Sequence, residues 1–212
     1  MANHLLFVGS SADANQPGIH AFGLDADTGA LEPRATYAGI ANPSFLAVHP
    51  NRAWLYAVSE LNDGSVCAFR FDAESGALEP INQQPSGGGA PCHLALDVVS
   101  GGWLVVSNYN SGTVGVLPIT DGGALGEPTH LVHHHGGGTH PKRQEGPHAH
   151  SATFAPDGRF VLVADLGIDQ IVVYAFDAAT GSLWRTHLRP RPARGGTASP
   201  RVSPGPRHPL RG

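Results

Sequence analysis

The sequence predicts an all-β fold, a partial β-propeller of about four four-stranded antiparallel blades. Three observations lead to this prediction. One turn sequence recurs four times, short runs of β-branched and aromatic residues fill the intervals between its copies, and no interval shows helical periodicity. The 28 glycines and 18 prolines among 212 residues also fit a chain with many turns.

The recurring turn reads DADTGALEP from Asp25, DAESGALEP from Asp72, TDGGALGEP from Thr120 and DAATGSLWR from Asp177. Its glycines, at 29, 76, 123 and 181, are 47, 47 and 58 residues apart. The longer interval contains a histidine-rich stretch, residues 133–150, which we interpret as an insertion between repeats. A period just under fifty residues with four strands is typical of a propeller blade. A β-sandwich is the alternative, but it has no reason to repeat its turn.

Each full repeat is expected to supply four short strands. They are expected at 44–48, 54–59, 65–71 and 78–83 in the second repeat, at 93–97, 103–108 and 113–119 in the third, and at 151–155, 160–165 and 170–176 in the fourth. We therefore predict an incomplete propeller over residues 1–183, with blades at about 3–40, 41–88, 89–145 and 146–183. Trp54, Trp103 and Phe160 are expected to pack between blades.

The bulk composition indicates a soluble, cytoplasmic protein. Hydrophobic residues make up 41% of the chain, enough for a core, yet no apolar run approaches the length of a membrane span. The N-terminal sequence MANHLLFVGSS lacks a basic leader, so we expect no signal peptide. Cys67 and Cys92 each lie in an apolar run and are expected to be buried free thiols.

Charge is distributed unevenly along the chain. Seven of the thirteen Lys and Arg residues follow residue 183, where no acidic residue occurs, so residues 1–183 carry six basic and all seventeen acidic groups, a formal −11. Such a body would repel nucleic acid. We expect neither a nucleic-acid nor a membrane partner. An anionic small molecule would have to be bound by a local group of cations, and Lys142 and Arg143 are the only adjacent basic pair before residue 184.

Strand alternation predicts which loops share a face. In a blade, the loop between the second and third strands lies on the same side as the loop that enters the next blade. Polar side chains in these loops should therefore converge on one mouth, the default place for a binding site. They are Glu60, His93, Asn108, Asn110, His148, His150 and Asp165. The acidic and amide groups among them could equally cap turns.

Several segments resemble a known family. NPSFLAVHPNRAWLYAVSE, GAPCHLALD, SNYNSGTVGVLPI and above all RQEGPHAHSATFAPDGRFVLVADLGID are similar to the lactonase-type seven-bladed propellers, over about residues 3–183. That family includes bacterial 6-phosphogluconolactonases and, more distantly, fungal carboxymuconate-lactonising enzymes. The resemblance implies hydrolysis of a sugar lactone of the pentose phosphate pathway, with no metal or other cofactor.

The resemblance also implies roles for individual residues. His150 matches the family's catalytic histidine, with His148 beside it, and Arg143, Gln144 and Glu145 match the adjoining loop. Arg207 falls in a GPRH motif that is similar to one opening a further blade of the family.

The chain departs from the family after Leu183. Residues 184–212 contain seven arginines and six prolines but few aliphatic residues, so no strand ladder is expected there. Shifting common GC-rich codons for residues 191–198 by one base can give VPPGAGPR, which the family shows before its next blade. We therefore predict a tail read out of frame, with a natural disordered basic tail as the alternative. Four blades would leave the pocket without part of its wall, which should weaken or abolish activity.

Lactone hydrolysis needs a base for the attacking water, a stabiliser for the oxyanion and an acid for the departing alkoxide. His150 is the expected general base and acid, and Lys142 with Arg143 the expected anion clamp. The competing interpretation of His150 is a hydrogen-bonded histidine at the start of a strand with no catalytic role. For Lys142 and Arg143 it is a solvated pair of charges. Residues 133–135 are expected to be solvated loop or an adventitious metal site, because no cysteine or carboxylate spacing supports functional zinc.

Two other functions compete with the lactonase. A lactonising cyclase acting on a muconate could use the same base and anion clamp. A non-catalytic propeller could instead present this face to a protein partner, although exposed aromatic residues would then be expected there.

Overall fold

The computed structural model describes residues 3–51 and 53–186, which form four antiparallel sheets. The first holds β1 (Asn3–Gly9), β2 (Ile19–Asp25) and β3 (Leu31–Tyr37). The second holds β4 (Leu46–Val48), β5 (Trp54–Ser59), β6 (Ser65–Phe71) and β7 (Leu78–Pro85). The third holds β8 (Pro91–Leu96), β9 (Trp103–Asn108), β10 (Thr113–Pro118) and β11 (His130–His133). The fourth holds β12 (Ala149–Phe154), β13 (Phe160–Asp165), β14 (Gln170–Asp177) and β15 (Ser182–Arg185).

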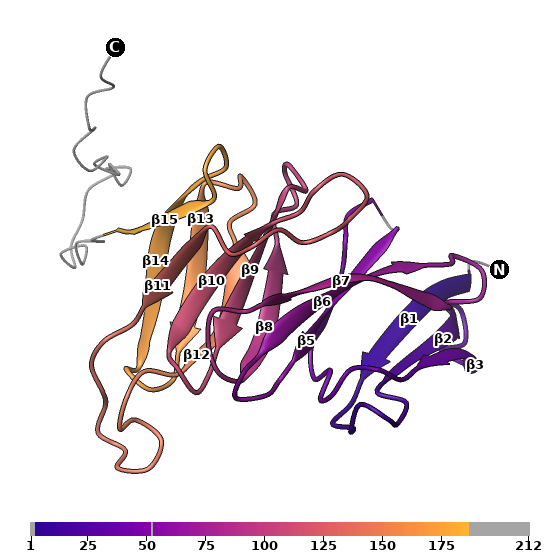
Figure 1. Cartoon of the computed structure of the whole chain (residues 1–212), viewed down its shortest axis with the longest axis horizontal. Helices are drawn as coiled ribbons and strands as arrows, with labels where there is room; N and C mark the ends of the chain where they lie inside the picture. The colour runs from indigo at the N-terminus through magenta and orange to yellow at the C-terminus, as the bar shows by residue number, and fades with distance from the viewer. Residues whose placement is uncertain (1–2, 52, 187–212) are drawn as a thin grey trace.

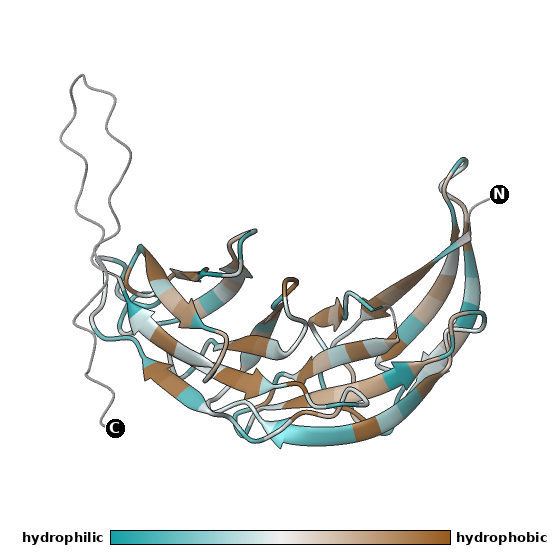
Figure 2. Cartoon of the chain, turned by 90° about the horizontal axis from the view of Figure 1, so that it is seen from above, coloured by the Kyte–Doolittle hydropathy of each residue, from teal (hydrophilic) through white to brown (hydrophobic). Residues whose placement is uncertain are grey.

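The sheets follow one another along the chain and stand side by side in an open arc (Figures 1 and 2). Each sheet has its strands in sequence order, and neighbouring strands are antiparallel throughout. The first strands β4, β8 and β12 contact one another from sheet to sheet, and β11 and β15 contact one another on the outer side. The predicted all-β partial propeller is confirmed.

The first sheet differs from the expected four strands. Its β2–β3 turn, DADTG at residues 25–29, is similar to the β6–β7 turn, DAESG at 72–76, and to the β14–β15 turn, DAATG at 177–181. The strands β1, β2 and β3 thus correspond to the second, third and fourth strands of the other sheets. Within the described residues, the first sheet has no counterpart of β4, β8 and β12.

The repeated turn is held by its first aspartate. In the second sheet, Asp72 Oδ1 accepts hydrogen bonds from the N–H groups of Glu74 and Ser75, at 3.1 and 2.7 Å. The N–H of Gly76 bonds the Asp72 carbonyl oxygen at 2.9 Å, and Gly76 has a φ of 71°, a conformation that glycine adopts without strain. The sequence repeat is therefore a repeat of local backbone chemistry.

The turn glycines also let adjacent sheets approach closely. A Cβ added to Gly123 would lie 2.4 Å from the Trp54 ring, and one added to Gly181 would lie 2.1 Å from the Trp103 ring. The Trp103 indole N–H also donates to the Ala178 carbonyl oxygen at 2.9 Å. The two tryptophans thus pack between sheets, as predicted.

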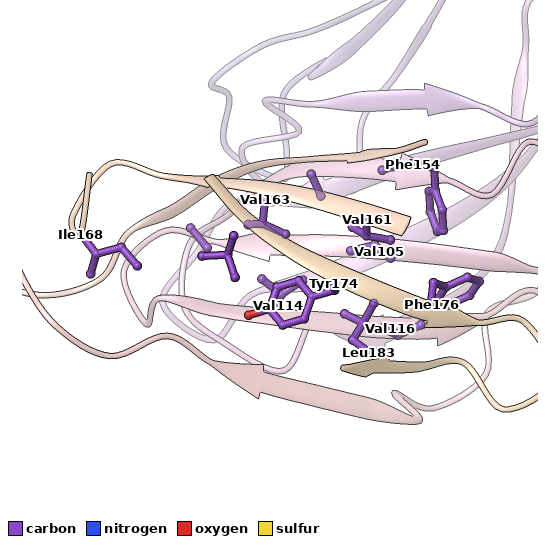
Figure 3. Packing of buried hydrophobic residues seen from close by; sticks show 14 residues of the cluster. Val105, Val114, Val116, Phe154, Val161, Val163, Ile168, Tyr174, Phe176 and Leu183 are labelled. Carbon is purple, nitrogen blue, oxygen red and sulfur yellow. The ribbon is translucent and has the colours of Figure 1, made fainter. Parts of the chain in front are cut away.

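Apolar side chains fill the space between the third and fourth sheets. Figure 3 shows Val105, Val114, Val161, Tyr174 and Phe176 from both sheets within one cluster. Burial of this apolar surface, at roughly 25 cal/mol per Å², is the main force that joins one sheet to the next. The outer faces of the end sheets expose further apolar groups: Leu6, Val8 and Leu31 at one end and Leu162, Ile171 and Trp184 at the other.

Two glycine substitutions should separate backbone strain from packing. Gly29, with a φ of 73°, has open space around it, whereas Gly181, with a φ of 67°, faces the Trp103 ring. We expect Gly29→Ala to lower the free energy of unfolding by about 1 kcal/mol through strain alone. Gly181→Ala should lose about 1–3 kcal/mol more, because the ring must move. Urea denaturation measures both, and equal losses would contradict this account of the sheet contact.

The strand pattern was expected to stop at Leu183. In the structure β15 runs to Arg185, so the fourth sheet continues two residues further. Arg185 Nη2 donates to Gln170 Oε1 at 3.1 Å. The rest of the predicted tail, from residue 187 onward, lies outside the described residues.

Candidate functional site

The histidine-rich insertion crosses the loop end of the third and fourth sheets; Figure 1 shows it as the long loop between β11 and β12. Gln144 holds it in place. The Gln144 side chain accepts the N–H of His140 at 3.0 Å and donates to the Leu166 carbonyl oxygen, between β13 and β14, at 2.9 Å. Both ends of the Gln144 side-chain amide are thus hydrogen-bonded to the backbone of loops.

His148 is fixed by three neighbours. Its backbone N–H donates to Asp165 Oδ1 at 2.8 Å, and its Nδ1–H donates to the Tyr109 carbonyl oxygen at 3.0 Å. The remaining ring nitrogen, Nε2, lies 3.5 Å from Glu145 Oε1. The carbonyl partner sets the tautomer, so Nε2 is the nitrogen available for proton transfer.

His150 lies near the start of β12 with its side chain exposed. Its Nδ1 is 3.6 Å from the Cys92 sulfur, and the edge of its ring meets the Tyr109 ring with centroids 5.8 Å apart. Burial, together with the charge of Glu60, raises the pKa of the Cys92 thiol to about 12. Cys92 therefore stays protonated at neutral pH, which argues against a thiolate nucleophile.

His93 lies on the neighbouring inner strand, β8. Its ring packs on Phe45 with centroids 4.1 Å apart, and its Nδ1 accepts the N–H of Ala152 at 3.3 Å. Burial, reinforced by the charge of His150, lowers the pKa of His93, so this ring is neutral at pH 7. His93 and His150 thus lie on adjacent first strands, β8 and β12, of neighbouring sheets.

The predicted cations lie in the insertion. Arg143 and Lys142 are both exposed, and the Arg143 guanidinium donates through Nη2 to the Tyr109 hydroxyl at 3.3 Å. Glu145 is exposed as well. Within the described residues its carboxylate lies near His148, and it forms no ion pair with Arg143. The structure therefore gathers Arg143, His148 and His150 around Tyr109.

The remaining predicted site residues have other surroundings. Asn108 is fully buried, and its amide donates to Ser86 and Thr113. Asn110 is exposed and bonds Asn62 at 3.1 Å, while the half-buried Glu60 accepts the Ser44 hydroxyl.

Asp165 is buried and receives backbone N–H groups, as the turn-capping alternative predicted. Besides His148, Gly167 and Ile168 donate to its Oδ1 at 2.9 and 3.1 Å. Its second oxygen, Oδ2, lies 2.5 Å from Nδ1 of His134. The carboxylate is therefore fully engaged inside the protein.

His134 corrects the prediction of a solvated loop for residues 133–135. His133 and His135 are exposed, but His134 is buried against Asp165 and stacks on Tyr174 with centroids 6.0 Å apart. In addition, residues 130–133 form the fourth strand of the third sheet, so the insertion begins only after His133. Among the described residues, no group of three His, Cys, Asp or Glu side chains is placed to hold a metal ion.

The buried His134 predicts a pH dependence of stability. Burial lowers the pKa of His134, although the hydrogen bond to Asp165 opposes the effect. The unfolded chain takes up a proton near the ordinary value of 6.5 while the folded protein does not, so stability should fall as the pH drops below about 6.5. His93 contributes with the same sign.

The measurement is the free energy of unfolding as a function of pH, by urea denaturation. His134→Gln should reduce its slope below pH 6.5. His133→Gln, a change at an exposed neighbour, should leave the slope as it is. A slope unchanged in His134→Gln would contradict a neutral buried imidazole.

Two members of the cluster were not predicted from the sequence. Tyr109 lies within the segment SNYNSG, but a single aromatic residue in a turn did not indicate a functional role. Cys92 was expected to be buried; both cysteines are free, but only Cys67 is buried and Cys92 is half-buried beside His150. Arg207 lies outside the described residues.

The part of the chain that the structure describes contains no helix with the length and apolarity needed to cross a bilayer.

Comparison with known proteins gives a consistent set of relatives. The 6-phosphogluconolactonase of Bacillus subtilis is 33% identical over 175 residues, which cover 82% of this chain and 50% of the relative. A solved structure from Bacteroides fragilis superposes with a TM-score of 0.79 at 33% identity, covering 87% of this chain and 52% of the other. The periplasmic gluconolactonase of Pseudomonas aeruginosa superposes with a TM-score of 0.75 at 30% identity, covering 82% and 50%.

The chain spans about half the length of the curated relatives it matches. Residues 5–210 match the family model described as lactonase, 7-bladed beta-propeller, so the match continues past residue 183, where the resemblance was expected to end. The chain belongs to the lactonase family of seven-bladed β-propellers.

Proposed function

We propose that this site hydrolyses a phosphorylated sugar lactone, converting 6-phosphogluconolactone to 6-phosphogluconate. The observation that carries the proposal is the convergence of His148, His150 and Arg143 on Tyr109, where loops of the third and fourth sheets meet. The relatives that bear the name 6-phosphogluconolactonase support the choice of substrate.

In the proposed reaction, His150 removes a proton from a water molecule while the water oxygen attacks the carbonyl carbon of the lactone. The carbonyl electrons move to oxygen, giving a tetrahedral oxyanion whose charge a neighbouring hydrogen-bond donor would stabilise. The oxyanion then collapses, the bond to the ring oxygen breaks, and the imidazolium of His150 returns the proton to the departing alkoxide. Water is the proposed nucleophile because the Cys92 thiol stays protonated.

Substrate binding is assigned to the exposed cations of the insertion. Lys142 and Arg143 would contact the phosphate, Arg143 through its planar fork and Lys142 as a point charge. Residues 1–183 are strongly acidic, so these cations give a local attraction in a body that otherwise repels anions. His148, with Nε2 beside Glu145, would support the protonation steps of His150.

A phosphorylated lactone also favours a cytoplasmic location, because a phosphate ester does not diffuse across a membrane. Hydrolysis of the lactone would place the protein in the pentose phosphate pathway. The names of the relatives favour this reaction over a muconate-lactonising cyclase and over a protein-binding propeller.

The test is hydrolysis of 6-phosphogluconolactone by the purified chain, corrected for the spontaneous rate, beside glucono-lactone and a muconate. We expect the phosphorylated lactone to have the highest kcat/KM, by about tenfold or more over the uncharged lactone, because the phosphate contacts are charge-assisted. Faster turnover of the muconate, or no rate above the spontaneous one, would overturn the proposal.

A further inference from the structure

We infer that Tyr109 is a positioning residue that holds the rings of His148 and His150 and the guanidinium of Arg143 in one arrangement. The inference rests on the proposed hydrolysis and adds to it the side chain that orients its working groups. Because Tyr109 acts through these three residues, its removal should change how they work rather than remove a reacting group.

The backbone of Tyr109 is anchored across two loops. Its N–H donates to the Ala90 carbonyl oxygen at 2.8 Å, and the N–H of Asn110 donates to Gly89 at 3.0 Å. These bonds tie the β9–β10 loop to the segment that enters β8. Tyr109 is therefore held on a rigid part of the third sheet, while the three groups it contacts belong to the insertion and to β12.

Tyr109 contacts both histidines at once. The His148 ring stacks on it with centroids 4.4 Å apart and planes 14° apart, and the His150 ring meets it edge-on at 5.8 Å and 77°. The Tyr109 carbonyl oxygen also accepts the Nδ1–H of His148. The backbone thus sets the tautomer of His148, and the aromatic ring sets the planes of both imidazoles.

The hydroxyl of Tyr109 has a separate task. It accepts the Arg143 Nη2 hydrogen bond at 3.3 Å, and Arg143 is otherwise an exposed side chain on a loop. An unrestrained arginine loses rotamer freedom when it binds an anion. A guanidinium already held by a phenol loses less, so the hydroxyl should lower KM while the ring supports kcat.

This division of tasks predicts different effects of two substitutions. Tyr109→Phe keeps the ring, so kcat should stay near that of the unsubstituted protein while KM rises by about threefold to tenfold through the lost hydrogen bond. Tyr109→Leu removes the ring, so kcat should fall by about tenfold to a hundredfold because both imidazoles lose their orientation. Tyr37→Phe is the matched control, since Tyr37 packs on Phe69 between the first and second sheets. It should change neither constant.

Ring-proton NMR resonances of the histidines separate a failure of this inference from a failure of the proposed function. In Tyr109→Leu the resonances of His148 should move downfield as the stacked ring is lost, and those of His150 should also move, whereas in Tyr109→Phe both sets should stay. If the unsubstituted protein has no lactonase activity, the proposed function fails, and these shifts alone decide the role of Tyr109. Unmoved resonances in Tyr109→Leu, or a kcat within about twofold of the unsubstituted protein, would overturn the inference.

Discussion

His150→Ala is expected to reduce lactone hydrolysis by about a hundredfold to ten-thousandfold, the usual contribution of a general base and acid. His150 is exposed near the start of β12 and lies beside the Cys92 thiol, which burial keeps protonated, so the imidazole is the proposed proton acceptor there. The loss should appear in kcat, because the phosphate contacts assigned to Lys142 and Arg143 do not involve His150.

The matched control is His133→Ala, which removes an exposed histidine at the end of β11. It should leave kcat and KM unchanged. Rates are measured as release of acid from the lactone, with the spontaneous hydrolysis subtracted. Comparable activity in His150→Ala and His133→Ala would place the proton-transferring group elsewhere.

Asp165→Ala is expected to lower the free energy of unfolding by about 3–5 kcal/mol, because it removes the acceptor of several buried hydrogen bonds and each donor left unpaired costs about 1–3 kcal/mol. Asp165 Oδ1 accepts the N–H groups of His148, Gly167 and Ile168, and its Oδ2 accepts Nδ1 of His134. Alanine would leave these donors buried without a partner.

Asp165→Asn should be less destabilising than the alanine variant, since one amide oxygen can still accept the backbone N–H groups. Asp121→Ala, in an exposed turn, is the control and should give an unchanged urea midpoint. The same midpoint for Asp165→Ala and the control would contradict the assignment of Asp165 as the organising group of this corner.

Much of the fold could be predicted because its signals are local. The turn that begins at Asp72 forms from contacts within five residues, and strand alternation then assigns each loop to a face. The same rule, together with its motif, made His150 a predicted site residue. The three-stranded first sheet was missed because the repeat pattern does not show which strand of the first repeat lacks a counterpart.

The predictions failed where burial depends on distant partners. His134 stands between two exposed histidines, and its pairing with Asp165 joins residues 31 positions apart on adjacent sheets. Tyr109 lies 39 positions from His148 and gains its role only when the insertion folds over it. Neither contact has a sequence spacing that could have indicated it.

The measurement that tests the central claim most directly is an NMR titration of the purified chain with 6-phosphogluconate, the product of the proposed reaction. We expect the ring resonances of His148 and His150 to shift in a saturable way, while those of the exposed His133 and His135 stay. Arg143→Ala should weaken this binding by about tenfold, as expected for loss of a charge-assisted contact. Shifts confined to other histidines, or none at any concentration, would contradict a lactone-binding site around Tyr109.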